Sequence, residues 1–185
     1  MKSHVRIIGG RWRGRKLPVI DAVGLRPTPD RVRETLFNWL APKCTGARVL
    51  DCFAGSGALG FEAMSRGADD LVIMESHPEA LVNLGRQARE MGCDAVTILG
   101  GDVGANLPRL TGLFDIVFID PPYSQPELRK QTLLALEPQL HDEAWIYFEW
   151  PRNETFSLPA ERWQWRKHKT AGQIEYALAE RCPSR

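Results

Sequence analysis

From residue 48 onward, short apolar runs alternate with longer amphipathic stretches, and this alternation restricts the fold more than any other feature. Alternating strands and helices predict βαβ units and a parallel sheet that helices cover on both faces. Folds of this doubly wound α/β type bind ligands at the carboxyl ends of their strands. The expected strands are 48–51, 70–75, 95–99, 114–120 and 144–149, with helices near 58–66, 78–91, 104–109 and 126–137.

The end of the chain departs from this alternation. Residues 162–169 and 173–180 have the pattern of two further strands, and only residues 170–172 connect them. So short a connection permits an antiparallel hairpin but not a parallel crossover. We therefore expect a mostly parallel, seven-stranded sheet that ends in an antiparallel hairpin, whereas a dinucleotide dehydrogenase domain is expected to continue with parallel strands.

The first 48 residues are strongly basic. They hold 11 Lys/Arg and 3 Asp/Glu, a net charge of +8, whereas the rest carries −7 and the whole chain +1. A basic end on an acidic chain suggests a polyanionic partner, and a solvated tail is the alternative. We interpret residues 1–25 as a flexible basic arm or small hairpin. Residues 26–47 are expected to contain a helix, capped by Asp30, that packs on a main domain of residues 48–185.

The composition indicates where the protein is located and whether it carries a metal or disulfides. No run of about 18 apolar residues predicts a membrane span, and no apolar signal region follows the first residues. Cys44, Cys52, Cys93 and Cys182 are scattered without a CxxC pair, which argues against a zinc site or a disulfide framework. The four histidines show no metal-ligand spacing and are expected at the surface. We therefore expect a cytoplasmic monomer without a metal or a membrane anchor.

A glycine-rich turn follows the first strand of the main domain. Residues 49–60 read VLDCFAGSGALG, in which Gly55 and Gly57 permit positive φ and a close approach of the backbone to a ligand. A GxGxxG pattern alone also serves dinucleotides. Asp51 favours a different ligand, because its carboxylate would repel a pyrophosphate but attract the ammonium of an amino-acid moiety.

Two further acids follow the next two strands. Glu75 stands where an acid accepts hydrogen bonds from both hydroxyls of a ribose, and Asp102 where an acid accepts from an adenine amine. The three motifs together resemble the cofactor motifs of class I methyltransferases, which have a Rossmann-like α/β fold and bind S-adenosylmethionine. An NAD-binding domain is the weaker alternative. The expected cofactor-binding residues are Thr28, Asp51, Phe53, Gly55, Gly57, Glu75, Ser76, Asp102 and Val103.

The sequence Asp120-Pro121-Pro122-Tyr123 is the most specific motif in the chain. Proline lacks an N–H and has a fixed φ, so the backbone here is stiff and its carbonyls are available as acceptors. The Asp120 carboxylate and the Pro121 carbonyl can accept the two protons of a target amine, and the Tyr123 ring can stack on a base. The motif resembles the (D/N/S)PP(Y/F) signature of methyltransferases that act on adenine N6, cytosine N4 or guanine N2. All four residues are expected to be catalytic.

The two ends of the chain extend this resemblance. Residues 6–17, 24–39 and 167–176 are similar to segments of the bacterial 16S ribosomal RNA guanine-N2 methyltransferases of the RsmD type. The resemblance implies that the helix within 26–47 closes over the cofactor and that the substrate is a guanine of 16S ribosomal RNA in the small subunit. Cationic side chains of the arm neutralise phosphates, and Trp12 can stack on an unpaired base. The expected RNA-binding residues are Arg6, Arg11, Trp12, Arg13, Arg15, Lys16 and Arg26.

Other functions remain open from the residues alone. The choice of guanine N2 over adenine N6 rests on the family resemblance. An adenine-N6 or cytosine-N4 methyltransferase that acts on DNA or RNA is the alternative enzyme, although 185 residues leave little room for a target-recognition domain. A methyltransferase fold used only to bind nucleic acid is the alternative outside catalysis, and the intact acids and Asp120–Tyr123 motif argue against it.

Overall fold

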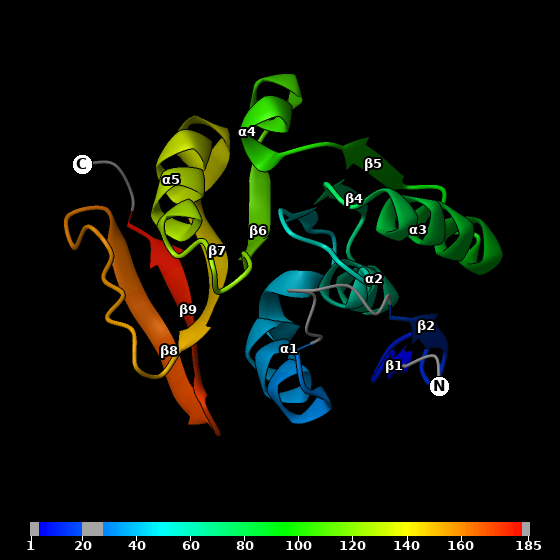
Figure 1. The fold of residues 1–185 in the computed structure, drawn as a ribbon, viewed down its shortest axis with the longest axis horizontal. Helices are drawn as coiled ribbons and strands as arrows, with labels where there is room; N and C mark the ends of the chain where they lie inside the picture. The colour runs from blue at the N-terminus through cyan, green and yellow to red at the C-terminus, as the bar shows by residue number, and fades with distance from the viewer. Residues whose placement is uncertain (1–3, 20–27, 183–185) are drawn as a thin grey trace.

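The computed structural model describes residues 4–19 and 28–182, and a seven-stranded sheet forms its centre (Figure 1). Its strands are β3 (Arg48–Asp51), β4 (Asp70–Glu75), β5 (Val96–Gly100), β6 (Phe114–Ile119), β7 (Leu140–Pro151), β8 (Trp163–Ala171) and β9 (Ile174–Arg181). Their order across the sheet is β5-β4-β3-β6-β7-β9-β8. The strands β3 to β7 are parallel, and β9 pairs antiparallel with both β7 and β8. The predicted parallel sheet with a C-terminal hairpin is confirmed.

The order of the strands defines where a ligand can enter. The chain proceeds from β3 outward through β4 to β5 and then returns to the other side of β3 with β6. The helices that follow β3 and β6 therefore lie on opposite faces and leave a crevice at the carboxyl ends of these strands. In open α/β sheets this switch point is the usual ligand site.

Helices cover both faces of the sheet, as two buried clusters show. Phe118 of β6 packs with Phe37 and Phe61 on one face, and its neighbour Ile119 packs with Leu133 and Leu136 on the other. Side chains alternate along a strand, so β6 is buried on both faces. The first face is covered by α1 (Asp30–Cys44), α2 (Ala58–Ser65) and α3 (Pro78–Met91). The second is covered by α4 (Val103–Asn106) and α5 (Glu127–Leu136), each followed by a 3-10 turn, η1 (Leu107–Arg109) and η2 (Glu137–Gln139).

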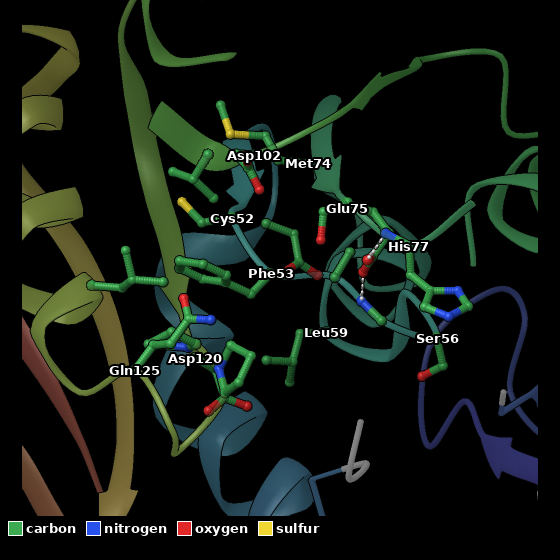
Figure 2. Close-up of a pocket in the computed structure, with 18 of the residues that line it drawn as sticks. Cys52, Phe53, Ser56, Leu59, Met74, Glu75, His77, Asp102, Asp120 and Gln125 are labelled. Atoms are coloured by element: carbon green, nitrogen blue, oxygen red, sulfur yellow. Dashed lines mark hydrogen bonds between the residues drawn. The ribbon is translucent and has the colours of Figure 1, made fainter. Parts of the chain in front are cut away.

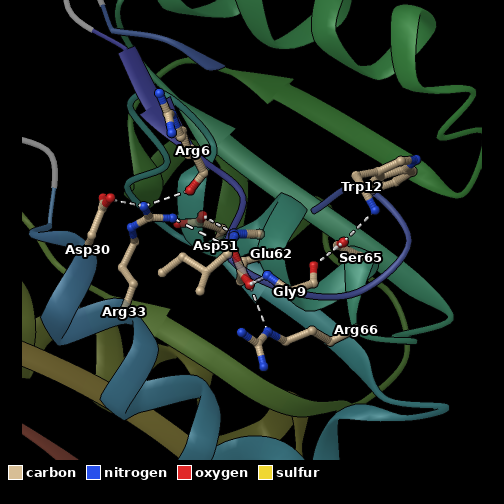
Figure 3. A network of polar contacts seen from close by, with 11 residues as sticks. Arg6, Gly9, Trp12, Asp30, Arg33, Asp51, Glu62, Ser65 and Arg66 are labelled. Atoms are coloured by element: carbon tan, nitrogen blue, oxygen red, sulfur yellow. Dashed lines mark hydrogen bonds and ion pairs between the residues drawn. The ribbon is translucent and has the colours of Figure 1, made fainter. Parts of the chain in front are cut away.

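The basic N-terminal segment is a hairpin docked on α2. Strands β1 (His4–Arg6) and β2 (Lys16–Pro18) pair antiparallel. The backbone N–H groups of Ile8 and Gly9 donate to the Glu62 carboxylate at 2.7 and 2.8 Å. The N–H of Trp12 donates to the Ser65 hydroxyl at 2.9 Å (Figure 3). For residues 4–19 the hairpin prediction is therefore correct and the prediction of flexibility is wrong. The apolar side chains that the hairpin buries are those of Val5, Ile7 and Leu17.

The start of α1 differs from the expectation. Pro29 occupies the N-cap position, and Asp30 is the first helical residue, with no side-chain capping bond. The Asp30 carboxylate accepts instead from the Arg33 guanidinium at 2.7 Å. Pro29 already has the fixed φ of an extended residue, so the helix starts one position earlier than a capping Asp30 requires. The helix also continues to Cys44, whose side chain is buried.

All four cysteines lie within the described residues. Cys44, Cys52, Cys93 and Cys182 are free thiols. Within 4–19 and 28–182, no three His, Cys, Asp or Glu side chains group as metal ligands. No helix in the same residues is long and apolar enough to cross a membrane.

Candidate active site

A pocket of about 930 Å³ opens at the carboxyl ends of β3, β4, β6 and β7 (Figure 2). It brings the predicted cofactor motifs and the predicted catalytic motif together, although they are separated by some 70 residues of chain. Gly57 is the one predicted cofactor residue that does not line the pocket. The predicted residues that do are Thr28, Asp51, Phe53, Gly55, Glu75, Ser76, Asp102, Val103, Asp120, Pro121, Pro122 and Tyr123.

The glycine turn is required by backbone geometry. Gly55 and Gly57 adopt φ values of 54° and 75°, in the left-handed region that glycine tolerates best. A Cβ atom at Gly57 would lie 2.6 Å from carbon atoms of Leu84 and Phe61. Gly57 therefore serves the packing of α2 behind the turn, and Gly55 is the glycine that faces the pocket.

Asp51 is a buried carboxylate at the end of β3. Its side chain is 3% exposed, and one of its oxygens accepts from the Gly60 N–H at 3.1 Å. Burial raises the pKa of Asp51 to about 7, against the opposing effect of the Gly60 N–H, and the negative charge of Glu75 raises it further. A cation placed here would relieve both destabilising effects, so the position favours a positively charged ligand group.

Glu75 fixes the floor of the pocket. Its two carboxylate oxygens accept from the backbone N–H groups of Gly55 and His77, both at 2.7 Å (Figure 2). These bonds tie the glycine turn to the end of β4 and hold the carboxylate in one orientation. Each carboxylate oxygen has a second lone pair, so the same group can accept from ligand hydroxyls.

His77 lies in the pocket, which corrects the prediction that all four histidines lie at the surface. It is half-buried and lines the cavity because the chain turns inward directly after Glu75. Its Nδ1 atom is buried and has no hydrogen-bond partner in the described chain. His4, His141 and His168 are exposed as predicted.

The catalytic motif begins directly after β6. Asp120 is half-buried, Pro121 is buried, and the Tyr123 side chain is 39% exposed. The Tyr123 hydroxyl donates to one oxygen of Glu149 at 2.5 Å. Glu149 stands near the end of β7, is 4% exposed and lines the pocket. The sequence analysis missed it, although an acid at the end of an apolar strand is the same signal that identified Asp51 and Glu75.

Several charges act on Asp120. Burial raises its pKa well above the usual value for an aspartate, and the nearby carboxylates of Glu149 and Asp51 raise it further. The Arg129 guanidinium acts in the opposite direction. Arg129 lies on α5, is fully buried and forms an ion pair with Glu154. Periodicity could not identify Arg129, because an arginine on an amphipathic helix usually faces solvent.

Cys52 lines the pocket but is not a nucleophile. It is 1% exposed, and burial raises the pKa of its thiol well above the usual value. A neutral buried thiol is unreactive, because the thiolate is the nucleophilic form. Cys52 therefore serves as a packing residue at the wall of the pocket.

The predicted RNA-binding residues lie on the hairpin, outside the pocket. The side chains of Arg6, Arg11, Arg13 and Lys16 are exposed, and Arg26 lies outside the described residues. Two side chains are less available than expected. Arg15 forms an ion pair with Glu90 at 3.0 Å. Trp12 is half-buried against the core, with the Arg11 guanidinium 4.0 Å from the centre of its ring.

The fold and this pocket define a class I methyltransferase. The sheet is mostly parallel with a C-terminal hairpin, and its switch point brings the acids at the ends of β3 and β4 together with an Asp-Pro-Pro-Tyr turn. The model of the family Conserved hypothetical protein 95 matches residues 5–180. The chain belongs to this family.

Relatives and a solved structure support the assignment. The chain is 44% identical to ribosomal RNA small subunit methyltransferase D of Escherichia coli (strain K12) over 182 residues, 97% of this chain and 91% of the relative. The Haemophilus influenzae protein of the same name is 42% identical over 183 residues, 96% of this chain and 94% of the relative. The solved structure of Escherichia coli yhhF superposes with a TM-score of 0.86 at 43% identity and covers 98% of this chain and 100% of that chain.

Proposed function

We propose that this protein transfers a methyl group from S-adenosylmethionine to the exocyclic N2 amine of a guanine in 16S ribosomal RNA, within a partly assembled small ribosomal subunit. One observation carries the proposal: a single pocket joins cofactor-type acids to Asp120–Tyr123, in a chain 44% identical to a ribosomal RNA small subunit methyltransferase. Radiolabelled S-adenosylmethionine, incubated with purified small or large subunits, tests it. Label is expected in small subunits, and label in large subunits alone would contradict the substrate.

The residues that line the pocket fit S-adenosylmethionine. Its amino-acid ammonium, ribose hydroxyls and adenine amine each need an acceptor, and we assign these to Asp51, Glu75 and Asp102 in that order. The raised pKa of buried Asp51 supports its pairing with a cation. The bonds of Glu75 to the glycine turn support its assignment to the ribose, since they fix its orientation. When bound, the cofactor supplies an electrophilic methyl group on a sulfonium.

The catalytic motif would hold the target amine. The Asp120 carboxylate and the Pro121 carbonyl accept its two protons, which favours a pyramidal nitrogen with its lone pair directed at the methyl group. An exocyclic amine is a weak nucleophile because the ring delocalises this lone pair, so orientation and electrostatics are the main contributions of the protein. Only ionised Asp120 accepts in this way; burial and the carboxylates of Glu149 and Asp51 raise its pKa, and Arg129 opposes them. The Asp120 carboxylate would take the proton that the amine gives up on methylation.

The affinity for S-adenosylmethionine is expected to depend on pH through Asp51. In the unliganded protein Asp51 has a pKa of about 7, and only its ionised form attracts an ammonium. The affinity should therefore be highest above pH 7 and fall about tenfold per pH unit below it. Calorimetric titrations between pH 5.5 and 7.5 measure this dependence. The Asp51→Asn variant should bind weakly with little pH dependence, and a flat wild-type profile would exclude Asp51 as the partner of the ammonium.

The hairpin is expected to bind RNA through its charges. Replacing Arg11, Arg13, Arg15 and Lys16 by glutamine should weaken RNA binding and reduce the slope of log K against log salt by about 2 to 3. The expected change is below that for four contacts because Arg15 already pairs with Glu90. Filter binding between 50 and 300 mM salt provides the slopes. Lys130→Gln, on the exposed side of α5, is the control. An unchanged slope in the fourfold variant would place RNA elsewhere.

We further propose that the protein acts as a monomer in the cytoplasm. The large apolar side chains that the described residues expose belong to different segments: Val82 on α3, Leu113 before β6, Tyr123 after β6, Leu134 on α5 and Trp165 on β8. Isolated apolar side chains of this kind are normal on the surface of a monomer.

A further inference from the structure

A second carboxylate stands beside Asp120 at the edge of the sheet. Strands β6 and β7 are parallel, and Ile119 is paired with Phe148. Asp120 directly follows β6 and Glu149 is the next residue of β7, so both stand one position beyond the last ladder pair and line the same pocket. The residues two positions earlier, Phe118 and Tyr147, are buried on one face of the sheet with their rings in edge contact.

Two tyrosines hold the Glu149 carboxylate in place. Tyr123, from the catalytic motif, donates to one oxygen at 2.5 Å, and Tyr147, from within β7, donates to the other at 2.9 Å. With one bond to each oxygen, the plane of the carboxylate is fixed. A carboxylate offers roughly four acceptor positions, so two tyrosine hydroxyls do not exhaust its capacity. The same contact fixes the hydroxyl end of Tyr123, the ring on which the target base is expected to stack.

The neighbouring ring nitrogen distinguishes guanine from the other amino bases. In guanine the N2 amine lies next to N1–H, which is a donor. In adenine the N6 amine lies next to N1, and in cytosine the N4 amine lies next to N3, and both of these nitrogens are acceptors. A fixed carboxylate beside the group that holds the amine therefore attracts guanine and repels the ring nitrogen of adenine or cytosine. A site that accepts a hydrogen bond from a donor group of its substrate discriminates strongly, in kcat/KM, against analogues that lack this donor.

We propose that Glu149 is the residue that selects guanine, by accepting the N1–H of the target base while Asp120 and Pro121 hold its N2 amine. This inference rests on the proposed function and deepens it, because it assigns the choice of base to a residue of this chain. The Tyr123–Glu149 hydrogen bond then links the stacking ring to the group that reads the edge of the base.

The test uses small subunits reconstituted with 16S RNA that carries either guanosine or 2-aminopurine riboside at the methylated position. 2-Aminopurine keeps the N2 amine but has an acceptor at N1. Wild-type enzyme is expected to prefer guanosine by at least about a hundredfold in kcat/KM. Glu149→Gln should lower kcat/KM for guanosine by about a hundredfold and leave that for 2-aminopurine nearly unchanged, because the amide can donate to N1. The preference for guanosine would then collapse.

Controls separate this role from a structural one. Tyr123→Phe removes one of the two bonds that fix the Glu149 carboxylate but keeps the carboxylate itself, so its preference for guanosine should fall far less than in Glu149→Gln. An equal loss on both substrates in Glu149→Gln would show that Glu149 only supports the fold of the site, and no loss on either would also overturn the inference. If Glu149→Gln does not melt cooperatively, the comparison of the two substrates with wild-type enzyme decides. Equal wild-type rates on guanosine and 2-aminopurine would show that no group of the site recognises N1–H. Failure of wild type to methylate N2 of guanosine would instead refute the proposed function.

Discussion

Asp120→Ala is expected to lower kcat about tenfold to a thousandfold while leaving the affinity for S-adenosylmethionine nearly unchanged. The Asp120 carboxylate stands after β6, apart from Glu75 and Asp102 in the same pocket (Figure 2). Its loss removes an acceptor for the target amine at the point where positive charge develops on the nitrogen. Single-turnover methylation of small subunits measures the chemical step, and calorimetry measures the cofactor affinity.

Two further variants make this result specific. Asp142→Ala removes an exposed aspartate of β7 that does not line the pocket, and it should leave kcat unchanged. Asp120→Asn keeps one carbonyl acceptor but adds a donor that competes with the amine, so its kcat should fall between those of wild type and Asp120→Ala. A collapse of cofactor affinity in Asp120→Ala would place Asp120 in the cofactor site and refute its assignment to the amine.

Glu62→Ala is expected to lower the free energy of unfolding by about 3 to 5 kcal/mol. Glu62 is fully buried in α2 and accepts from the N–H groups of Ile8 and Gly9 and from Arg66 Nε at 2.7 Å (Figure 3). The fully buried Arg33 lies 3.7 Å from the same carboxylate. Without Glu62, the Arg33 charge keeps only its contact with Asp30 and the Arg6 carbonyl, and two backbone donors lose their partner.

Urea unfolding followed by circular dichroism measures this loss. Glu34→Ala is the matched control, because it removes an exposed glutamate from a helix and should change stability by less than about 0.5 kcal/mol. Since the hairpin is fastened to α2 through Glu62, Glu62→Ala should also speed hydrogen exchange at Ile8 and Gly9. A loss of less than about 1 kcal/mol would mean that water replaces the carboxylate and that the hairpin is held by its apolar contacts.

The features that sequence reasoning predicted correctly are local ones. Apolar runs placed β3 to β6 within one or two residues. For β3, β4 and β6 the reason is that strands buried on both faces have few polar residues. The positions of Asp51, Glu75 and Asp120 followed from these runs, since each acid stands at a strand end and parallel strands bring their carboxyl ends to one edge. Their meeting in one pocket is therefore a consequence of topology alone.

The features that it missed depend on partners distant in sequence. Glu62 and Arg33 lie on amphipathic helices, and nothing in their local pattern shows that the hairpin backbone needs a buried carboxylate. The prediction of a flexible arm failed for the same reason: its charge was visible, whereas the donors and acceptors that dock it belong to α2. Glu149 carries the same strand-end signal as Asp51 and Glu75, but its place beside Asp120 depends on the register between β6 and β7. Registers of parallel strands are set by packing across the whole sheet.

The most direct test of this account identifies the methylated nucleoside. Small subunits purified from a strain that lacks the gene are incubated with the protein and radiolabelled S-adenosylmethionine, with protein-free 16S RNA in a parallel reaction. The RNA is then digested to nucleosides and separated by chromatography. The account predicts label in N2-methylguanosine, with faster incorporation in the assembled subunit than in free RNA. Label in N6-methyladenosine would contradict the choice of base, and absence of label from both substrates would contradict the proposed activity itself.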